Sequence, residues 1–136
     1  MNKRELVSVI ITTKNEESVI ARLILSLNQQ IYPHKKIILV DNSSTDKTLD
    51  IAHKMGVKTY NFGPERSAQR NFGAKKAKGK YFLFLDADMQ LPPNVVEECV
   101  KICLNDKKVG AVVIPEQSIA SNFWEKVKAF ERSFYN

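Results

Sequence analysis

Short apolar runs alternate with helical patterns along the chain, and this order constrains the fold more than any other feature. The apolar runs predict strands at 6–11, 36–40, 81–85 and 109–114, and we also expect a short strand at 57–60. Apolar residues at helical spacing predict helices at 16–28, 44–55, 67–77, 93–104 and 121–134. Ser44 or Thr45 is the expected cap of the second helix, and Gly56 its stop. Such alternation is typical of a mainly parallel sheet with helices on both faces, so we predict a single α/β domain.

The composition is that of a soluble globular chain, with 43% hydrophobic and 26% charged residues among 136. No apolar run approaches the roughly 18 residues of a membrane span, and the charged start does not resemble a secretory signal. Cys99 and Cys103 are four residues apart on a predicted helix, which favours small buried hydrophobic side chains over zinc ligands. Since nothing in the sequence requires an oxidising compartment, we expect a cytoplasmic protein.

A formal net charge of +6 favours anionic partners, and nucleic acid, anionic lipid and a nucleotide phosphate are the candidates. Nucleic acid is the weakest of these, because aromatic residues are not interleaved with basic ones and the charge is modest. Lysines at 75, 76, 78 and 80 form the densest basic cluster, which we interpret as a solvated helix end. Arg66 and Arg70 are one helical turn apart, so both can face one anion.

Two acids follow the fourth predicted strand directly, as Asp86 and Asp88. Side chains two apart on a strand point to the same side, so both carboxylates are expected at the carboxyl end of that strand. Open α/β sheets bind ligands at this edge. A divalent metal such as Mg²⁺ or Mn²⁺, which also carries phosphate oxygens, would offset the two charges. The alternative is a solvated acidic turn that caps the next helix.

Polar side chains also follow the other three strands of the first half of the chain. They are Thr12, Asn15 and Glu16 after the first strand, Asp41 and Asp46 after the second, and Arg66 and Arg70 after the third. Each could serve only as a helix cap or a turn residue. Taken together at one sheet edge, they predict a pocket for a nucleoside diphosphate.

In such a pocket, Asp41 could accept a hydrogen bond from the imide N–H of uracil. Arg66 and Arg70 could offer forked donors to the pyrophosphate oxygens. No phosphate-binding loop of the P-loop type and no dinucleotide-binding glycine motif is present in the sequence. A nucleotidylyltransferase would share the layered fold, but the glycine-rich basic first loop expected of that class is absent.

Four segments resemble the motifs of family 2 glycosyltransferases, which have the Rossmann-like GT-A fold. They lie at 7–17, 39–48, 70–73 and 84–88, in the family's order. The resemblance covers almost the whole chain through Asp88. It implies a nucleotide-sugar-binding domain at 1–115 and the start of an acceptor-side region at 116–136. It also implies transfer of a sugar, most often from a UDP-sugar, to a glycan or lipid-linked acceptor hydroxyl with inversion.

The resemblance also implies roles for single residues. By this resemblance, Thr12, Asn15 and Glu16 would line the nucleotide site, and Asp41 would hold uracil. Asp46 and Arg70 would shape the base and diphosphate pocket. Asp86 would lie near the ribose and sugar, and Asp88, with Asp86, would hold Mn²⁺ or Mg²⁺. Inverting transfer also needs a general base for the acceptor hydroxyl. The family places this base in a later Glu-Asp type motif, which is missing here. Glu116 is a weak candidate, and a catalytically silent domain that binds nucleotide-sugars or partners is the alternative.

The last predicted helix has one apolar stripe, formed by Phe123, Val127, Phe130 and Phe134. We expect this stripe to pack against the rest of the protein. Lysines and an arginine flank it, so peripheral contact with the inner face of a membrane is an alternative. An uncovered stripe could also drive self-association.

Overall fold

The computed structural model describes residues 4–112 and 114. The elements within them are β1 (Val7–Thr13), α1 (Ile20–Asn28), β2 (Lys35–Asp41), α2 (Thr48–Lys54), β3 (Lys58–Asn61), α3 (Arg66–Lys76), β4 (Tyr81–Asp86) and α4 (Val95–Asn105). The candidate base Glu116, the predicted helix at 121–134 and the acceptor-side region at 116–136 lie outside the described residues. None of the described helices is long and apolar enough to cross a bilayer.

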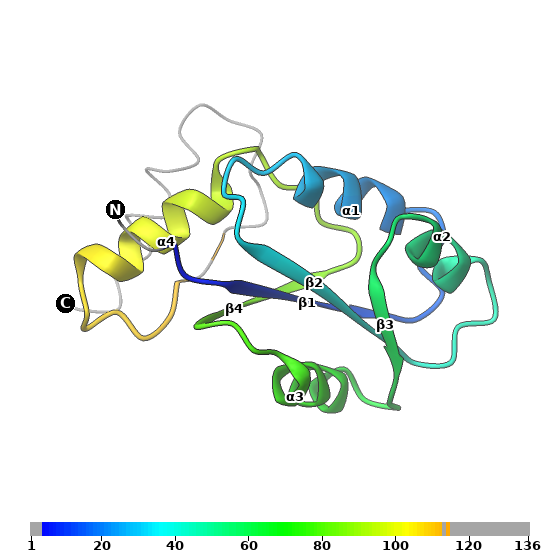
Figure 1. Ribbon diagram of the computed structural model, residues 1–136. Coiled ribbons are helices and arrows are strands. Elements are labelled where there is room, and N and C mark those ends of the chain that lie inside the picture. Colours follow the sequence, from blue (N-terminus) through cyan, green and yellow to red (C-terminus); the bar gives the residue numbers. More distant parts are fainter. Residues whose placement is uncertain (1–3, 113, 115–136) are drawn as a thin grey trace.

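The described strands form one parallel sheet in the order β3-β2-β1-β4. The register sets Thr13 of β1 beside Asp41 of β2, and Thr12 beside Asp86 of β4. Because parallel strands end on the same side, the loops that follow them lie together (Figure 1). We call this side of the sheet the strand-end edge.

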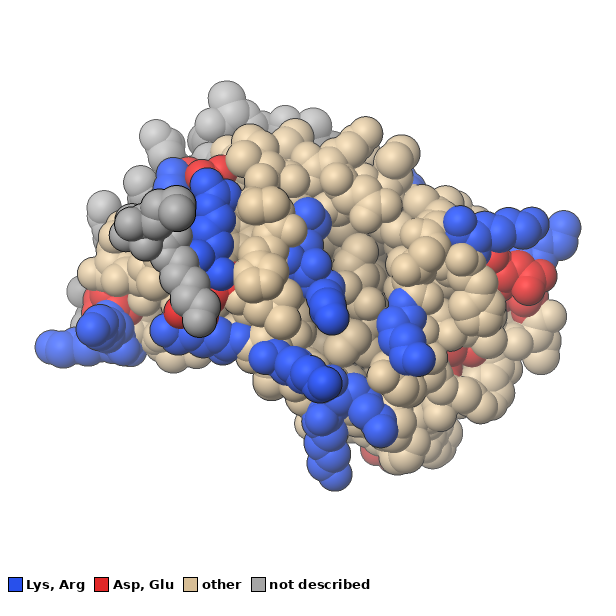
Figure 2. All heavy atoms as spheres, viewed as in Figure 1, with Lys and Arg blue, Asp and Glu red and all other residues tan. Residues whose placement is uncertain are grey.

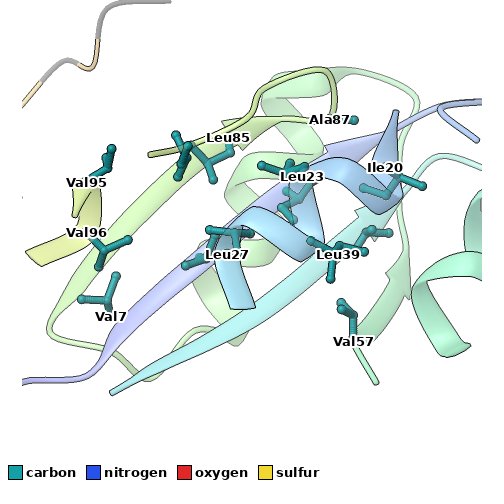
Figure 3. Close-up of a cluster of buried hydrophobic side chains, with 14 of the residues drawn as sticks. Val7, Ile20, Leu23, Leu27, Leu39, Val57, Leu85, Ala87, Val95 and Val96 are labelled. Carbon is teal, nitrogen blue, oxygen red and sulfur yellow. The ribbon is translucent and has the colours of Figure 1, made fainter. Parts of the chain in front are cut away.

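Helices cover both faces of this sheet, as predicted. In Figure 1, α1, α2 and α4 lie on one side of the strands and α3 lies on the other. The main core lies on the first side, where Leu23 and Leu27 of α1 are fully buried with Leu39 of β2 and Val95 of α4 (Figure 3). Burial of a continuous apolar stripe from α1 stabilises this layer, because each buried leucine contributes about 2 kcal/mol. The predicted α/β fold is therefore confirmed.

On the opposite side, α3 lies close to β1 and β2 because position 73 is a glycine. A Cβ at Gly73 would lie 2.6 Å from Cγ2 of Ile10 and 3.2 Å from Cγ2 of Val40. A larger residue would push the helix away from the sheet. Ile10 and Val40 therefore mark the face of the sheet that α3 covers.

β4 is the outermost strand at one end of the described sheet. Phe84 lies beside Ile10 in the register and Phe82 lies two residues before it, so both rings are on the α3 face. They remain 44% and 45% exposed, because α3 packs over β1 and β2. Leu83 and Leu85, which alternate with these rings along β4, pack into the main core on the other face.

The predicted start of the second helix was wrong. This helix begins at Thr48, whereas capping by Ser44 or Thr45 was expected. The Ser44 hydroxyl donates to the Asp41 carboxylate, and the Asp46 carboxylate accepts the Thr48 backbone N–H at 3.0 Å. The stop at Gly56 is confirmed by its φ of 78°, a left-handed conformation that glycine adopts without strain.

The start of the first helix and the last predicted strand also differ from the prediction. The first helix begins at Ile20 and not at residue 16, after a left-handed residue at Asn15 with φ of 53°. The predicted strand at 109–114 was wrong, since the described residues 109–112 and 114 form no strand. Val112 and Ile114 are instead partly buried against the core. A short apolar run can bury itself by packing alone, and periodicity does not distinguish this from strand pairing.

Candidate functional site

Asp41, at the end of β2, is buried at the centre of the strand-end edge, with an exposed fraction of 0%. The Thr13 hydroxyl donates to its Oδ1 at 2.6 Å, and the Ser44 hydroxyl donates to the same atom at 2.6 Å. The Ser44 backbone N–H donates to Oδ2 at 2.8 Å. A contact with uracil would need an accessible carboxylate oxygen. The geometry instead makes Asp41 the group that fixes the loop between β2 and α2.

The loops after β1 and β2 are tied together by further hydrogen bonds. Oδ1 of Asn15 accepts the Thr45 backbone N–H at 2.8 Å, and the Ser44 hydroxyl accepts the Asn15 backbone N–H at 2.8 Å. The Glu16 backbone N–H donates to the Thr48 hydroxyl at 2.8 Å. Asn15 and its neighbours therefore hold the shape of this part of the edge, and their side chains are largely engaged within the protein.

Asp46 belongs to the same network. Burial raises the pKa of its carboxyl, but hydrogen bonds from the side chain and N–H of Thr48 and from the N–H of Glu17 outweigh that effect. The pKa of Asp46 is therefore lowered, and the carboxylate stays ionised between the two loops. Asn15 and Asp46 lie at the predicted place, and their observed contacts are those of residues that organise the loops.

The pKa of Glu16 is raised, and its causes show which charges lie at the strand-end edge. Partial burial raises the pKa of its carboxyl, and the charges of Asp88, Asp46 and Asp86 raise it further, while Arg66 opposes them. These carboxylates follow three different strands, so the chain converges on one negative region. A cation bound there would relieve the repulsion.

The α3 side of the edge is built from charged groups that reach solvent. Nη2 of Arg70 lies 3.2 Å from Oδ1 of Asp86, and Nη1 of Arg66 lies 3.7 Å from the same oxygen. The arginine side chains are 42% and 60% exposed. Half-exposed pairs of this kind contribute little to stability, so the guanidinium groups remain available to an anionic ligand. The structure thus brings together Arg66, Arg70 and Asp86, as the sequence predicted.

Gln69, which sequence reasoning missed, anchors the helix that carries these arginines. Its side chain is 4% exposed, and Nε2 donates to the backbone oxygens of Thr13 at 3.0 Å and Val40 at 2.9 Å. The amide therefore bridges the ends of β1 and β2 from α3. The sequence signal for this role was the spacing of Gln69, which stands one helical turn before Gly73. That spacing puts both residues on the face of α3 that packs on the sheet.

The turn after β4 carries the second acid of the predicted metal pair. Ala87 is buried, whereas Asp86, the last residue of β4, is half-buried and Asp88 in the following turn is exposed. Nη2 of Arg22 donates to the backbone oxygen of Asp88 at 2.8 Å. This contact from α1 was not predicted, and it fixes the path of the turn.

The ligand set at this turn fits a metal that is shared with a bound molecule. Within residues 4–112 and 114, no three side chains of the ligating types form a metal-binding group. Mg²⁺ and Mn²⁺ often take one or two carboxylates from the protein and their other oxygens from phosphate and water. Thr12 lies beside Asp86 in the register. In the described part of the chain, its hydroxyl oxygen is a buried side-chain atom without a hydrogen-bond partner. The donor set at this edge therefore suits a phosphate-bound cation.

The family model "Glycosyl transferase family 2" matches residues 8–136. The chain belongs to this family. It is 39% identical over 89 residues to the UDP-Glc:alpha-D-GlcNAc-diphosphoundecaprenol beta-1,3-glucosyltransferase WfaP of Escherichia coli, covering 62% of this chain and 36% of that protein. It is 33% identical to the beta-monoglucosyldiacylglycerol synthase of Nostoc sp., and this match covers 93% of this chain and 30% of that protein.

The fold is also similar to that of solved glycosyltransferases. The crystal structure of S. aureus TarS 1–349 in complex with UDP superposes with a TM-score of 0.67 at 29% identity, covering 73% of this chain and 32% of that one. The chain spans less than half the length of the curated relatives described above.

Proposed function

We propose that this chain binds a nucleotide-sugar, most favourably a UDP-sugar, as the donor domain of a glycosyltransferase. The observation that carries the proposal is the convergence of Arg66, Arg70, Asp86 and Asp88 at the strand-end edge. Opposite charges arranged in this way can hold a diphosphate together with its counter-cation. TarS, which has this fold and 29% identity, was crystallised with UDP.

In the proposed complex, the guanidinium groups of Arg66 and Arg70 donate to the diphosphate oxygens. Asp86, which both arginines contact, lies near the ribose and the sugar. Thr12 and Glu16 line the floor of the nucleotide site. Asp41 has no proposed contact with the base, because its exposed fraction is 0% and its carboxylate is bound by Thr13 and Ser44.

Asp88, with Asp86, is the proposed holder of Mn²⁺ or Mg²⁺. When bound, such an ion supplies Lewis-acid stabilisation of the leaving diphosphate. The chain itself fixes the turn through the contact of Arg22 with the backbone of Asp88. It also places the carboxyl of Glu16 close enough to Asp88 to add to the negative charge there.

The proposed acceptor is a hydroxyl on a lipid-linked or membrane-lipid molecule. The E. coli relative is named for a diphosphoundecaprenol acceptor, and the Nostoc relative for synthesis of a glucosyldiacylglycerol. Transfer with inversion would need a general base, for which Glu116 is the candidate within this sequence.

Titration calorimetry with UDP tests the donor and metal assignments together. We expect UDP to bind in the presence of Mn²⁺, and EDTA or the Asp88→Asn variant to weaken binding by about tenfold or more. Asp50→Asn is the matched control, since Asp50 is an exposed acid on α2 away from the turn. Binding that is indifferent to both EDTA and Asp88→Asn would remove the metal assignment, and no binding of UDP under any condition would refute the proposed donor.

A further inference from the structure

The α3 side of strand β3 carries a group of aromatic and basic side chains, of which Phe62 and the lysines are exposed and the other two rings half-buried. Tyr60 lies beside Val40 in the register, so Lys58, Tyr60 and Phe62 all point to the face that α3 covers. Phe72 and Lys76, one helical turn apart on α3, meet them there. We call these five residues the basic-aromatic patch.

The rings of the patch are packed against one another. The Phe62 and Phe72 rings are stacked, with centroids 4.5 Å apart and planes at 14°, and Tyr60 meets Phe72 edge-on at 5.7 Å. Nζ of Lys76 lies 5.4 Å from the centroid of Phe72, and Nζ of Lys58 lies 5.6 Å from that of Tyr60. One face of Phe62 is therefore covered by Phe72, while Phe62 as a whole stays 42% exposed and both lysines are exposed.

Further exposed lysines lie on or next to the elements β2 and α3, which border the patch. Lys36 at the start of β2, Lys75 on α3 and Lys78 after α3 are all exposed. Within the residues that the structure describes, these three, Lys58 and Lys76 form no salt bridge. Figure 2 shows basic side chains gathered along the side of the molecule where α3 lies. This side has an uncompensated positive charge.

We propose that the basic-aromatic patch docks on the surface of an anionic lipid bilayer. Lysine ammonium groups suit a diffuse layer of lipid headgroups, and an exposed phenylalanine can enter the boundary between headgroups and acyl chains. Single-stranded nucleic acid is a poorer fit, because bases stack on exposed aromatic faces, and of these three rings Phe62 alone is exposed, with one face already stacked on Phe72.

This inference deepens the proposed function, on which it rests for the lipid nature of the acceptor. The Phe62 backbone N–H donates to the Asp41 backbone oxygen at 2.9 Å. The patch therefore borders the strand-end edge. A bilayer lying against it would bring lipid-linked hydroxyl groups alongside the donor site.

Vesicle flotation with the full chain tests the docking. We expect binding to phosphatidylcholine vesicles that contain a third phosphatidylglycerol, no binding to pure phosphatidylcholine, and release at high salt. The triple variant Lys58→Gln, Lys75→Gln, Lys76→Gln should bind on the order of 100-fold more weakly, at about fivefold per charge. The control variant Lys54→Gln, Lys101→Gln, Lys107→Gln removes the same charge elsewhere and should bind normally.

The proposal is overturned if anionic vesicles do not bind at low salt, or if the two triple variants lose affinity equally. It is also overturned if the chain prefers an oligonucleotide to the anionic vesicles and the patch variant abolishes that preference. UDP titration of the patch variant separates this from the donor proposal, because its UDP affinity should equal that of the unaltered chain. Vesicle binding by a chain that binds no UDP would preserve the docking surface and refute the donor site.

Discussion

On the β2 side of the strand-end edge the polar side chains bind one another, whereas on the α3 and β4 side they reach solvent. Asp41, Asn15 and Asp46 are held by donors from two loops. Arg66 and Arg70 make only half-exposed contacts with Asp86. Residues of similar chemistry thus have different tasks at one edge. The first group sets the shape of the pocket, and the second group is available to a ligand.

The most severe test of this comparison is Asp41→Ala. This change leaves the hydroxyl of Thr13 and both donors of Ser44 without their acceptor, so we expect unfolding to become easier by about 3 kcal/mol. Urea denaturation would measure the loss, with Asp50→Ala as the control.

The ligand readout of the same variant separates a structural role from contact with the base. Under conditions where Asp41→Ala stays folded, its affinities for UDP and for pyrophosphate should fall by similar factors. A loss confined to UDP, with normal stability, would show that Asp41 contacts the base after all.

A smaller effect is expected at Gln69, which joins the two sides. Gln69→Leu removes the donor from two backbone oxygens and should reduce stability by about 2 kcal/mol. Because Gln69 positions the helix that carries both arginines, the variant should lose affinity for UDP while its affinity for uridine changes little. The control is Asn71→Ala, an exposed residue of α3. Equal losses for UDP and uridine would limit Gln69 to a general structural role.

The smallest expected effect concerns Glu16 and pH. Its raised pKa means that the folded chain binds this proton more tightly than the unfolded chain does. The stabilisation of the folded state that comes from the protonated Glu16 is therefore complete below the ordinary pKa of glutamate. It is lost as the pH rises through the pKa of Glu16 in the folded state. Glu16→Gln should flatten this part of the stability profile in urea titrations across acidic pH. A cation at the turn should lower the pKa of Glu16, so Mn²⁺ should shift the same part of the profile to lower pH. An unchanged profile in the variant would argue against the convergence of charge at Glu16.

The layers and the edge could be predicted from the sequence because they depend on local patterns. Apolar runs identified β1, β2 and β4, and the acid pair was found because it follows the last of these runs directly. The burial of Asp41 could not be predicted in this way, because it depends on hydroxyl groups from another strand and from the next loop. The anchoring by Gln69 likewise requires the position of α3 over the sheet, which Gly73 sets.

The position of β4 in the sheet has a mechanical consequence for the two sides of the edge. Among the described residues, β4 has one neighbouring strand, β1, whereas β2 is held between β1 and β3. A strand fastened along a single border can be displaced by small forces that leave an interior strand unmoved. Any structure that comes to lie along the other border of β4 would thus change the distance between Asp86 and its two guanidinium partners, while the surroundings of Asp41 stay in place.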